Sequence, residues 1–164
     1  MNSKDHEPRL TRLLRELLTQ HRVASLGTLD NDGLPSVSMV PYAIDAQSAR
    51  ILIHVSALAS HTQNIQLRPK ISFMVMKSEI SDAPVHDLGR VSFSGVAVIL
   101  GAETEQYATA RRVYLSRFPE AEPMTQLGDF RFVSIQATGG RQVAGFGAAR
   151  SLDSQMLEAV FRTC

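Results

Sequence analysis

Residues 22–44 read RVASLGTLDNDGLPSVSMVPYAI, which is two β-like runs on either side of Asn31-Asp32-Gly33. Asparagine, aspartate and glycine readily adopt the positive φ angles that a tight hairpin turn needs. The stretch therefore predicts two antiparallel strands, over residues 22–30 and 34–44, joined by that turn.

Further elements are expected on both sides of this hairpin. Alternating or β-branched runs predict four more strands, at residues 50–55, 71–76, 91–100 and 130–136. Helical spacing of apolar residues predicts a packing helix within residues 1–20, a helix over 103–118 with Arg117 on its solvent side, and a helix over 152–162 within the segment 151–164. A glycine-rich bend is expected over residues 138–147.

Six strands joined mostly by hairpins argue against a parallel, doubly wound sheet. We expect an α+β fold, a six-stranded antiparallel β-barrel with flanking helices, in one domain over residues 1–164. Side chains fill the interior of a barrel of this size, so a sizeable ligand must lie in a groove at its wall or between two copies of the chain. The fold therefore predicts a homodimer.

The composition of the chain limits the kinds of partner that we expect it to bind. The formal net charge is +1 and the charges of both signs are scattered, so the sequence predicts no nucleic-acid partner and no binding to an anionic membrane. Residues 1–8 lack the apolar core of a signal peptide, and no run approaches the length that spans a membrane. The single cysteine, Cys164, fits a reducing compartment. We expect a cytoplasmic protein.

Two prolines, Pro35 and Pro41, bracket residues 36–40 in a run that otherwise resembles a central strand. Proline donates no hydrogen bond to a neighbouring strand, so this strand must have a free edge. Either the edge serves only the shape of the sheet, or its open backbone faces a planar ligand.

The segment HVSALASHTQNI, residues 54–65, passes from a strand into a short helix that carries hydroxyls and one imidazole. Ser56 is expected to cap that helix, and the free N–H groups of the first turn could then bind a phosphate or a carboxylate. The alternative is an ordinary capped helix that binds nothing.

Other chemistries lack their signatures. The five histidines show no metal-ligand spacing, and no serine lies in a Gly-x-Ser-x-Gly elbow. Gly145-Phe146-Gly147 resembles the start of a dinucleotide fingerprint, but Arg150 stands where the motif needs a small residue, so we interpret it as a tight bend.

With these residues in view, the chain resembles the FMN-binding split-barrel proteins related to pyridoxamine 5′-phosphate oxidase, and more narrowly the subgroup of haem-utilisation proteins. The resemblance covers roughly residues 23–152 and rests on four segments: 32–42, 56–65, 128–130 and 143–147. It implies a split barrel that forms a homodimer with two cofactor sites at the subunit interface.

The resemblance also implies the cofactor-binding residues. The backbone along the isoalloxazine ring would come from Ser38, Met39, Val40 and Pro41. The FMN phosphate would be held by Ser56, Ser60, His61 and Thr62. The site would be closed by Phe146 and Gly147. Because a bound flavin would carry the redox chemistry, no catalytic residue is named.

The chain departs from the oxidase pattern at the phosphate. Ser60-His61 stands where the oxidases place an Arg-Lys pair, and Ser38 replaces an arginine. Hydrogen bonds from neutral donors are about half as strong as those from charged ones, so the grip on a phosphate dianion is weaker. The segment with which the oxidases hold their vitamin B6 substrate is also missing, which excludes that activity. We expect an FMN-dependent oxidoreductase acting on another small molecule.

Haem is the alternative ligand. The haem-utilisation relatives take their axial histidine from near the carboxyl terminus, whereas this chain has no histidine after His86. Substitute iron ligands would be found among His54, His61, His86, Met74, Met76 and Cys164. Asp129 matches a position near the haem site of those relatives. A third alternative is an interaction module without a ligand.

Overall fold

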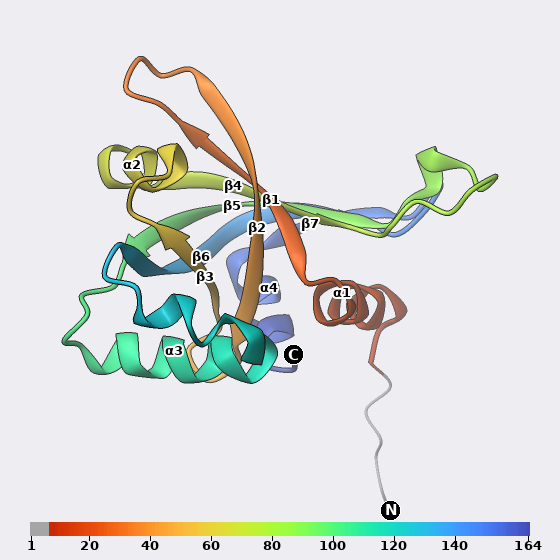
Figure 1. Cartoon of the computed structure of the whole chain (residues 1–164). Coiled ribbons are helices and arrows are strands. Elements are labelled where there is room, and N and C mark those ends of the chain that lie inside the picture. The colour runs from red at the N-terminus through yellow and green to blue at the C-terminus, as the bar shows by residue number, and fades with distance from the viewer. Residues whose placement is uncertain (1–6) are drawn as a thin grey trace, which may run out of the picture.

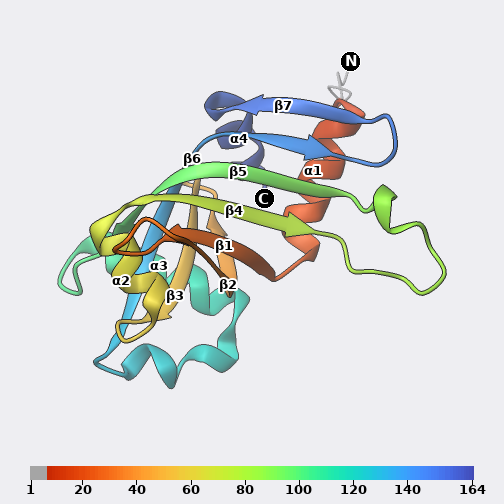
Figure 2. The same ribbon diagram turned by 90° about the horizontal axis from the view of Figure 1, so that it is seen from above.

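The computed structural model describes residues 7–164, and Figures 1 and 2 show it from two sides. The strands are β1 (Val23–Leu29), β2 (Pro35–Asp45), β3 (Arg50–Ser56), β4 (Lys70–Met76), β5 (Arg90–Ile99), β6 (Phe130–Val143) and β7 (Ala149–Asp153). The α-helices are α1 (Arg9–Gln20), α2 (Ser60–Leu67), α3 (Glu105–Arg117) and α4 (Ser154–Phe161). Three single 3-10 turns lie at Val85–Asp87, Pro119–Ala121 and Met124–Gln126.

The strands form one antiparallel sheet in the order β3-β2-β1-β4-β5-β6-β7, and β3 also pairs with β6. That additional pairing closes β1 to β6 into a barrel, while β7 extends the sheet beyond β6 (Figure 2). The predicted six-stranded antiparallel barrel with flanking helices is confirmed. The helix expected within residues 1–20 begins at Arg9, and residues 1–6 lie outside the described part of the chain.

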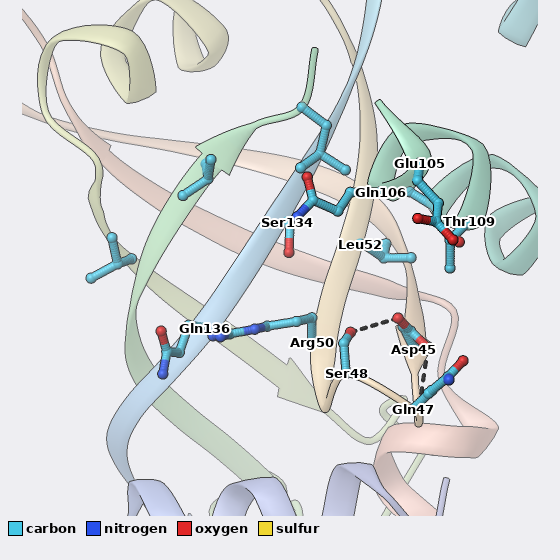
Figure 3. A pocket seen from close by; sticks show the side chains of 14 residues that line it. Asp45, Gln47, Ser48, Arg50, Leu52, Glu105, Gln106, Thr109, Ser134 and Gln136 are labelled. Atoms are coloured by element: carbon cyan, nitrogen blue, oxygen red, sulfur yellow. Dashed lines mark hydrogen bonds between the residues drawn. The ribbon is translucent and has the colours of Figure 1, made fainter. Parts of the chain in front are cut away.

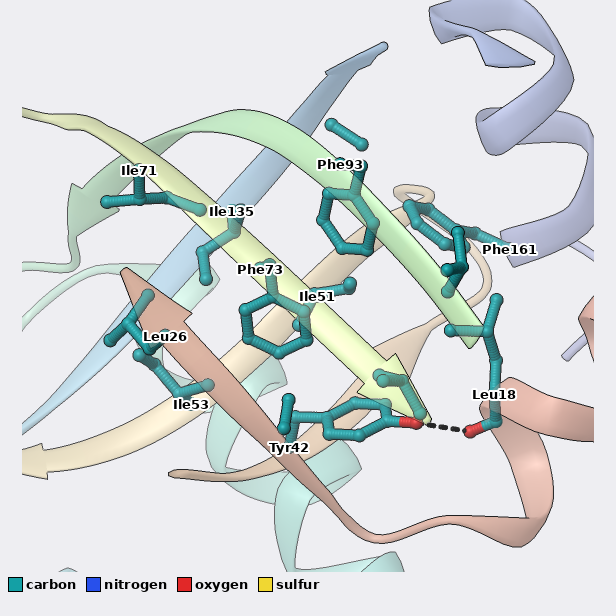
Figure 4. Packing of buried hydrophobic residues seen from close by; sticks show 14 of the residues in the cluster. Leu18, Leu26, Tyr42, Ile51, Ile53, Ile71, Phe73, Phe93, Ile135 and Phe161 are labelled. Carbon is teal, nitrogen blue, oxygen red and sulfur yellow. Dashed lines mark hydrogen bonds between the residues drawn. The ribbon is translucent and has the colours of Figure 1, made fainter. Parts of the chain in front are cut away.

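The barrel interior is filled by alternate side chains of its strands, as the period-2 pattern requires. Tyr42, Phe73 and Phe93 are buried there, with the Tyr42 and Phe73 rings edge to face at 5.5 Å (Figure 4). Leu18 of α1 and Phe161 of α4 complete the same core, so these two helices pack onto the barrel through their apolar faces.

A second apolar cluster lies outside the barrel, beneath α3. Leu52 and Phe132 point outward from β3 and β6 and pack against Tyr114 and Phe118. Because side chains of β3 are covered on both sides, residues 51–55 of this strand are all buried. This explains the continuous apolar run in its sequence.

The predicted bend over residues 138–147 is wrong in its first half. β6 continues to Val143 and pairs with β5 through Gly139 and Gly140. A side chain at Gly140 would put a Cβ atom 2.7 Å from the Cβ of Phe93, so glycine here permits a close approach of two strands.

The chain then turns at residues 144–148 and returns as β7, a strand the sequence pattern did not predict. The last helix accordingly begins at Ser154, capped by Asp153.

The expected solvent exposure of Arg117 is also wrong. Its guanidinium donates hydrogen bonds to the carbonyls of Thr19 and His21, at 3.1 and 2.7 Å, at the end of α1. The Tyr42 hydroxyl donates to the carbonyl of Leu18, at 2.7 Å. The last carbonyls of α1, which a helix itself leaves unpaired, are thus satisfied by distant parts of the chain.

Gly140→Ala tests the close approach of β5 and β6. The added methyl group must push Phe93 or the β5 backbone aside, so we expect the free energy of unfolding in urea to fall by about 2 kcal/mol. Gly128→Ala is the control, because no atom lies within 4 Å of its Cβ position. Equal stabilities of the two variants would contradict the packing described here.

Candidate functional site

The first half of β2 has a free edge. β2 pairs with β1 from Pro35 to Pro41, but with β3 only from Tyr42 to Asp45. Residues 35–41 therefore have a single neighbouring strand within the described sheet. This confirms the free edge that Pro35 and Pro41 predict.

The side chains along this edge differ in what they offer a ligand. Val37 and Met39 are 75% and 67% exposed, so they present apolar surface to the solvent. Val40 is buried in the barrel core, so only its backbone is left to contact a ligand. Ser38 and Pro41 are half-buried.

Ser38 and His61 meet at this edge. His61, in the first turn of α2, places Nδ1 3.1 Å from the hydroxyl oxygen of Ser38. Its other ring nitrogen, Nε2, is buried and has no hydrogen-bond partner among the described residues. Burial lowers the pKa of His61, which favours the neutral imidazole. The structure thus joins two residues that the sequence placed in separate parts of the site.

The predicted cap of α2 by Ser56 is wrong. The helix begins at Ser60 after Ala59, and no side chain among the described residues caps it. Ser56 ends β3, where its hydroxyl accepts the N–H of Leu58 and donates to the carboxylate of Asp129, both at 3.2 Å. The local pattern suggested a cap because it could not show that the chain makes one more turn before the helix starts.

The predicted phosphate ligands are corrected in part. Thr62 is fully buried and its hydroxyl donates to the carbonyl of Ser56 at 2.6 Å, so it holds the segment together and does not face a ligand. The carboxylate of Asp129 beside Ser56 brings a negative charge that opposes a phosphate dianion. Ser60 is exposed. Together these features make the segment a poor phosphate pocket.

Phe146 and Gly147 lie elsewhere. They belong to the turn between β6 and β7, which lies at the opposite side of the molecule from α2 in both views (Figures 1 and 2). Phe146 is 91% exposed. A single chain therefore does not bring these two residues to Ser38 and His61.

His54 is enclosed by aromatic rings. It is 6% exposed, and its ring centroid lies 4.4 Å from that of Phe132 and 5.0 Å from that of Phe130. Neither ring nitrogen has a hydrogen-bond partner among residues 7–164, and burial lowers its pKa to about 4. This closed setting makes His54 a packing residue and an unsuitable iron ligand.

A groove of about 870 Å³ lies between α3 and the outer wall formed by β3, β5 and β6 (Figure 3). Sequence reasoning missed it, because its lining comes from four separate stretches, residues 45–52, 96–100, 105–110 and 134–136, and no motif connects them. Within residues 7–164, no group of three or more histidine, cysteine or acidic side chains could hold a metal ion, and no helix is long and apolar enough to cross a lipid bilayer.

Comparison with known proteins places this geometry in a family. The family model described as pyridoxamine 5′-phosphate oxidase matches residues 10–144. The chain belongs to this family. Within the family, the chain is 28% identical over 142 residues to the protein named heme oxygenase HutZ of Vibrio cholerae, covering 86% of this chain and 80% of HutZ. It is 34% identical over 152 residues to the non-canonical heme oxygenase HOZ, chloroplastic, of Arabidopsis thaliana, covering 88% of this chain but 44% of HOZ.

Solved structures show the same fold. A heme binding protein from Mycobacterium smegmatis superimposes with a TM-score of 0.81 and 25% identity, over 93% of this family member and 61% of that chain. The structure of HutZ from Vibrio cholerae gives a TM-score of 0.73 at 24% identity, over 79% and 91% of the two chains, which supports the fold. This chain thus spans less than two thirds of the length of HOZ and of the Mycobacterium smegmatis protein.

These relatives overturn one prediction. The sequence favoured an FMN-dependent oxidoreductase, with haem as the alternative. The relatives named above are heme oxygenases or a heme binding protein, which contradicts the flavin-dependent reading and supports the alternative. The haem-utilisation subgroup within the family is confirmed, whereas FMN as the cofactor finds no support in these names.

The burial of His54 predicts a pH effect on stability. An unfolded histidine binds a proton near pH 6.5 but the folded His54 only near pH 4, so the unfolded chain takes up the proton first. Above pH 6.5 this histidine does not affect the free energy of unfolding. As the pH falls from 6.5 to 4, the free energy of unfolding should decrease by up to roughly 3 kcal/mol.

Urea unfolding between pH 4 and pH 7.5 measures this effect. His54→Phe should lose this part of the pH dependence, whereas His86→Gln, in an exposed turn, should keep the wild-type profile. Identical pH profiles for wild type and His54→Phe would show that His54 does not titrate as its burial implies.

Proposed function

We propose that this protein binds haem and degrades it, as a haem oxygenase of the haem-utilisation type. The observation that carries this proposal is the naming of two relatives, HutZ and HOZ, as heme oxygenases, across 86% and 88% of this chain. Haem is the substrate of such a reaction, so the protein has to hold the ring, bind its iron and exclude bulk water.

The residues at the β2 edge suit a flat apolar ring. Val37 and Met39 expose apolar side chains on the face of β2 opposite Ser38, beside an edge of the strand that is open, so a ring that also reaches His61 would lie across this edge without displacing another strand. Burying this surface under a ring would be favourable by the hydrophobic effect.

His61 is the histidine best suited to the iron. Its Nδ1 is occupied by Ser38, and its neutral Nε2 has no partner among the described residues. Nε2 is buried in the single chain, so iron would reach it only after the side chains that cover it move aside. Iron-binding histidines characteristically use one nitrogen for the metal while the other is held by a hydrogen bond that orients the ring. Neither nitrogen of His54 has a hydrogen bond that would orient its ring, and His86 lies in an exposed turn.

We further propose that the site is completed in a homodimer. Phe146 and Gly147 lie on the opposite side of the molecule from α2, so they could close the site only as part of a second chain (Figure 1). The high exposure of Phe146 is consistent with a role at an interface, because large exposed apolar side chains are enriched where partners bind.

Titration with hemin tests the proposed function. We expect a shifted Soret band that saturates at one haem per chain, and its loss when ascorbate and oxygen are added. His61→Ala should weaken hemin binding at least tenfold and change the spectrum, and Ser38→Ala should weaken it about tenfold by releasing the imidazole. His86→Ala is the control and should bind as the wild type does. An unchanged hemin spectrum, or binding of added FMN in its place, would contradict the proposal.

Mixed dimers test the shared site. His61→Ala and Phe146→Ser should each abolish tight binding in their own homodimers, because both sites are then defective. When the two variants are co-expressed, a mixed dimer has one intact site and one site with both defects, so about half of the hemin capacity of that dimer should return. A monomer in light scattering, or no recovery in the mixed dimers, would show that the site is formed within one chain.

A further inference from the structure

The groove beside α3 has a floor that the sheet register defines. Leu52 of β3, Ser134 of β6 and Val98 of β5 lie in one row, since Ser134 pairs with both of the others. The next row contains Gln136 and its partner Val96, with Arg50 at the β3 end. All these side chains point out of the barrel, because directly paired residues share a face of the sheet.

α3 covers only part of this wall. It packs on the row of Phe132 and His54, where its Tyr114 contacts both rings. It also covers Leu52, which is buried. The rest of the wall stays open, and the amino-terminal half of α3 forms the facing side of the groove with Glu105, Gln106 and Thr109 (Figure 3). A volume of about 870 Å³ lies within the usual range for small-molecule sites.

The charges of the groove are separated. Arg50 is paired with Asp45 in the register of the β2–β3 hairpin, yet within residues 7–164 its guanidinium forms no ion pair. The Asp45 carboxylate instead accepts bonds from its own turn, from the Ser48 hydroxyl at 2.5 Å and from the Gln47 N–H at 3.1 Å. Arg50 extends across the wall toward Gln136, away from Glu105 (Figure 3).

From this arrangement we infer that the groove is a second binding site, for a flat, largely apolar small molecule that carries one acidic group. The acidic group pairs with Arg50, whose planar guanidinium suits a carboxylate or sulfonate, and Gln136 can donate a further hydrogen bond. The apolar body lies on Val96 and Val98, beside the edge of α3 that covers Leu52. None of the residues that line the groove belongs to α2 or to residues 36–40 of β2, so this site is separate from the one proposed for haem.

Two matched dyes test the inference. 8-Anilinonaphthalene-1-sulfonate has a flat apolar body with one acidic group, and N-phenyl-1-naphthylamine is the same body without it. Titration of methyl-labelled protein should shift the NMR signals of Val96 and Val98 with the sulfonate, and more weakly with the neutral dye. Arg50→Gln should raise the Kd of the sulfonate about tenfold and leave that of the neutral dye unchanged, because only the charge-assisted bond is lost.

Arg112→Gln is the control, since it removes the same charge from an exposed position on α3 outside the groove. It should leave the Kd of both dyes unchanged. The inference is overturned if the shifts fall on Val37 instead, if Arg50→Gln leaves the sulfonate Kd unchanged, or if it weakens both dyes equally. Arg50→Gln should also keep wild-type hemin affinity. A parallel loss of hemin binding would overturn the inference of a separate site, whereas a protein that binds no hemin but still binds the sulfonate at Arg50 would contradict only the proposed function.

Discussion

Pairing of β3 with β6 is the constraint on which the rest of the structure depends. The register that runs from Ile51 and Ile135 to Ser56 and Phe130 turns an open sheet into a barrel and encloses the aromatic core. On its other edge, β3 pairs with β2 only through residues 50–53, so the two strands are no longer paired on the amino-terminal side of Tyr42. Residues 35–41 of β2 are left with a free edge, and the prolines in it are residues that such an edge tolerates.

The same pairing assembles the two candidate sites. It carries the start of β6 to the end of β3, so that Asp129 reaches Ser56 across 73 positions of sequence. On the outer wall it aligns β3, β6 and β5 into the rows that α3 covers at one end and leaves open at the other. The region around His61 and the groove at Arg50 are thus two products of one closed sheet, on different parts of its surface.

Local patterns predicted much of this fold because the relevant forces act over a few residues. Alternating apolar residues, the Asn31-Asp32-Gly33 turn and the leucine stripe of α1 report directly on burial and backbone preference. Prediction failed where a distant partner changed the local preference. Gly139 and Gly140 appeared as a bend, but the approach of β5 makes them part of a strand. Arg117 appeared solvated, but the end of α1 supplies its acceptors.

The sequence by itself determined the antiparallel barrel, the open edge of β2 and the candidate residues Ser38 and His61, because turn chemistry, proline geometry and side-chain period are properties of short segments. Only the tertiary structure decided which of these residues meet. Ser38 and His61 come together, Thr62 is buried against Ser56, and Phe146 lies on the other side of the molecule. The groove at Arg50 likewise has no sequence signal, since its lining depends on the register between strands and on where α3 crosses them. Contacts of this kind arise when the barrel closes, and no single segment encodes them.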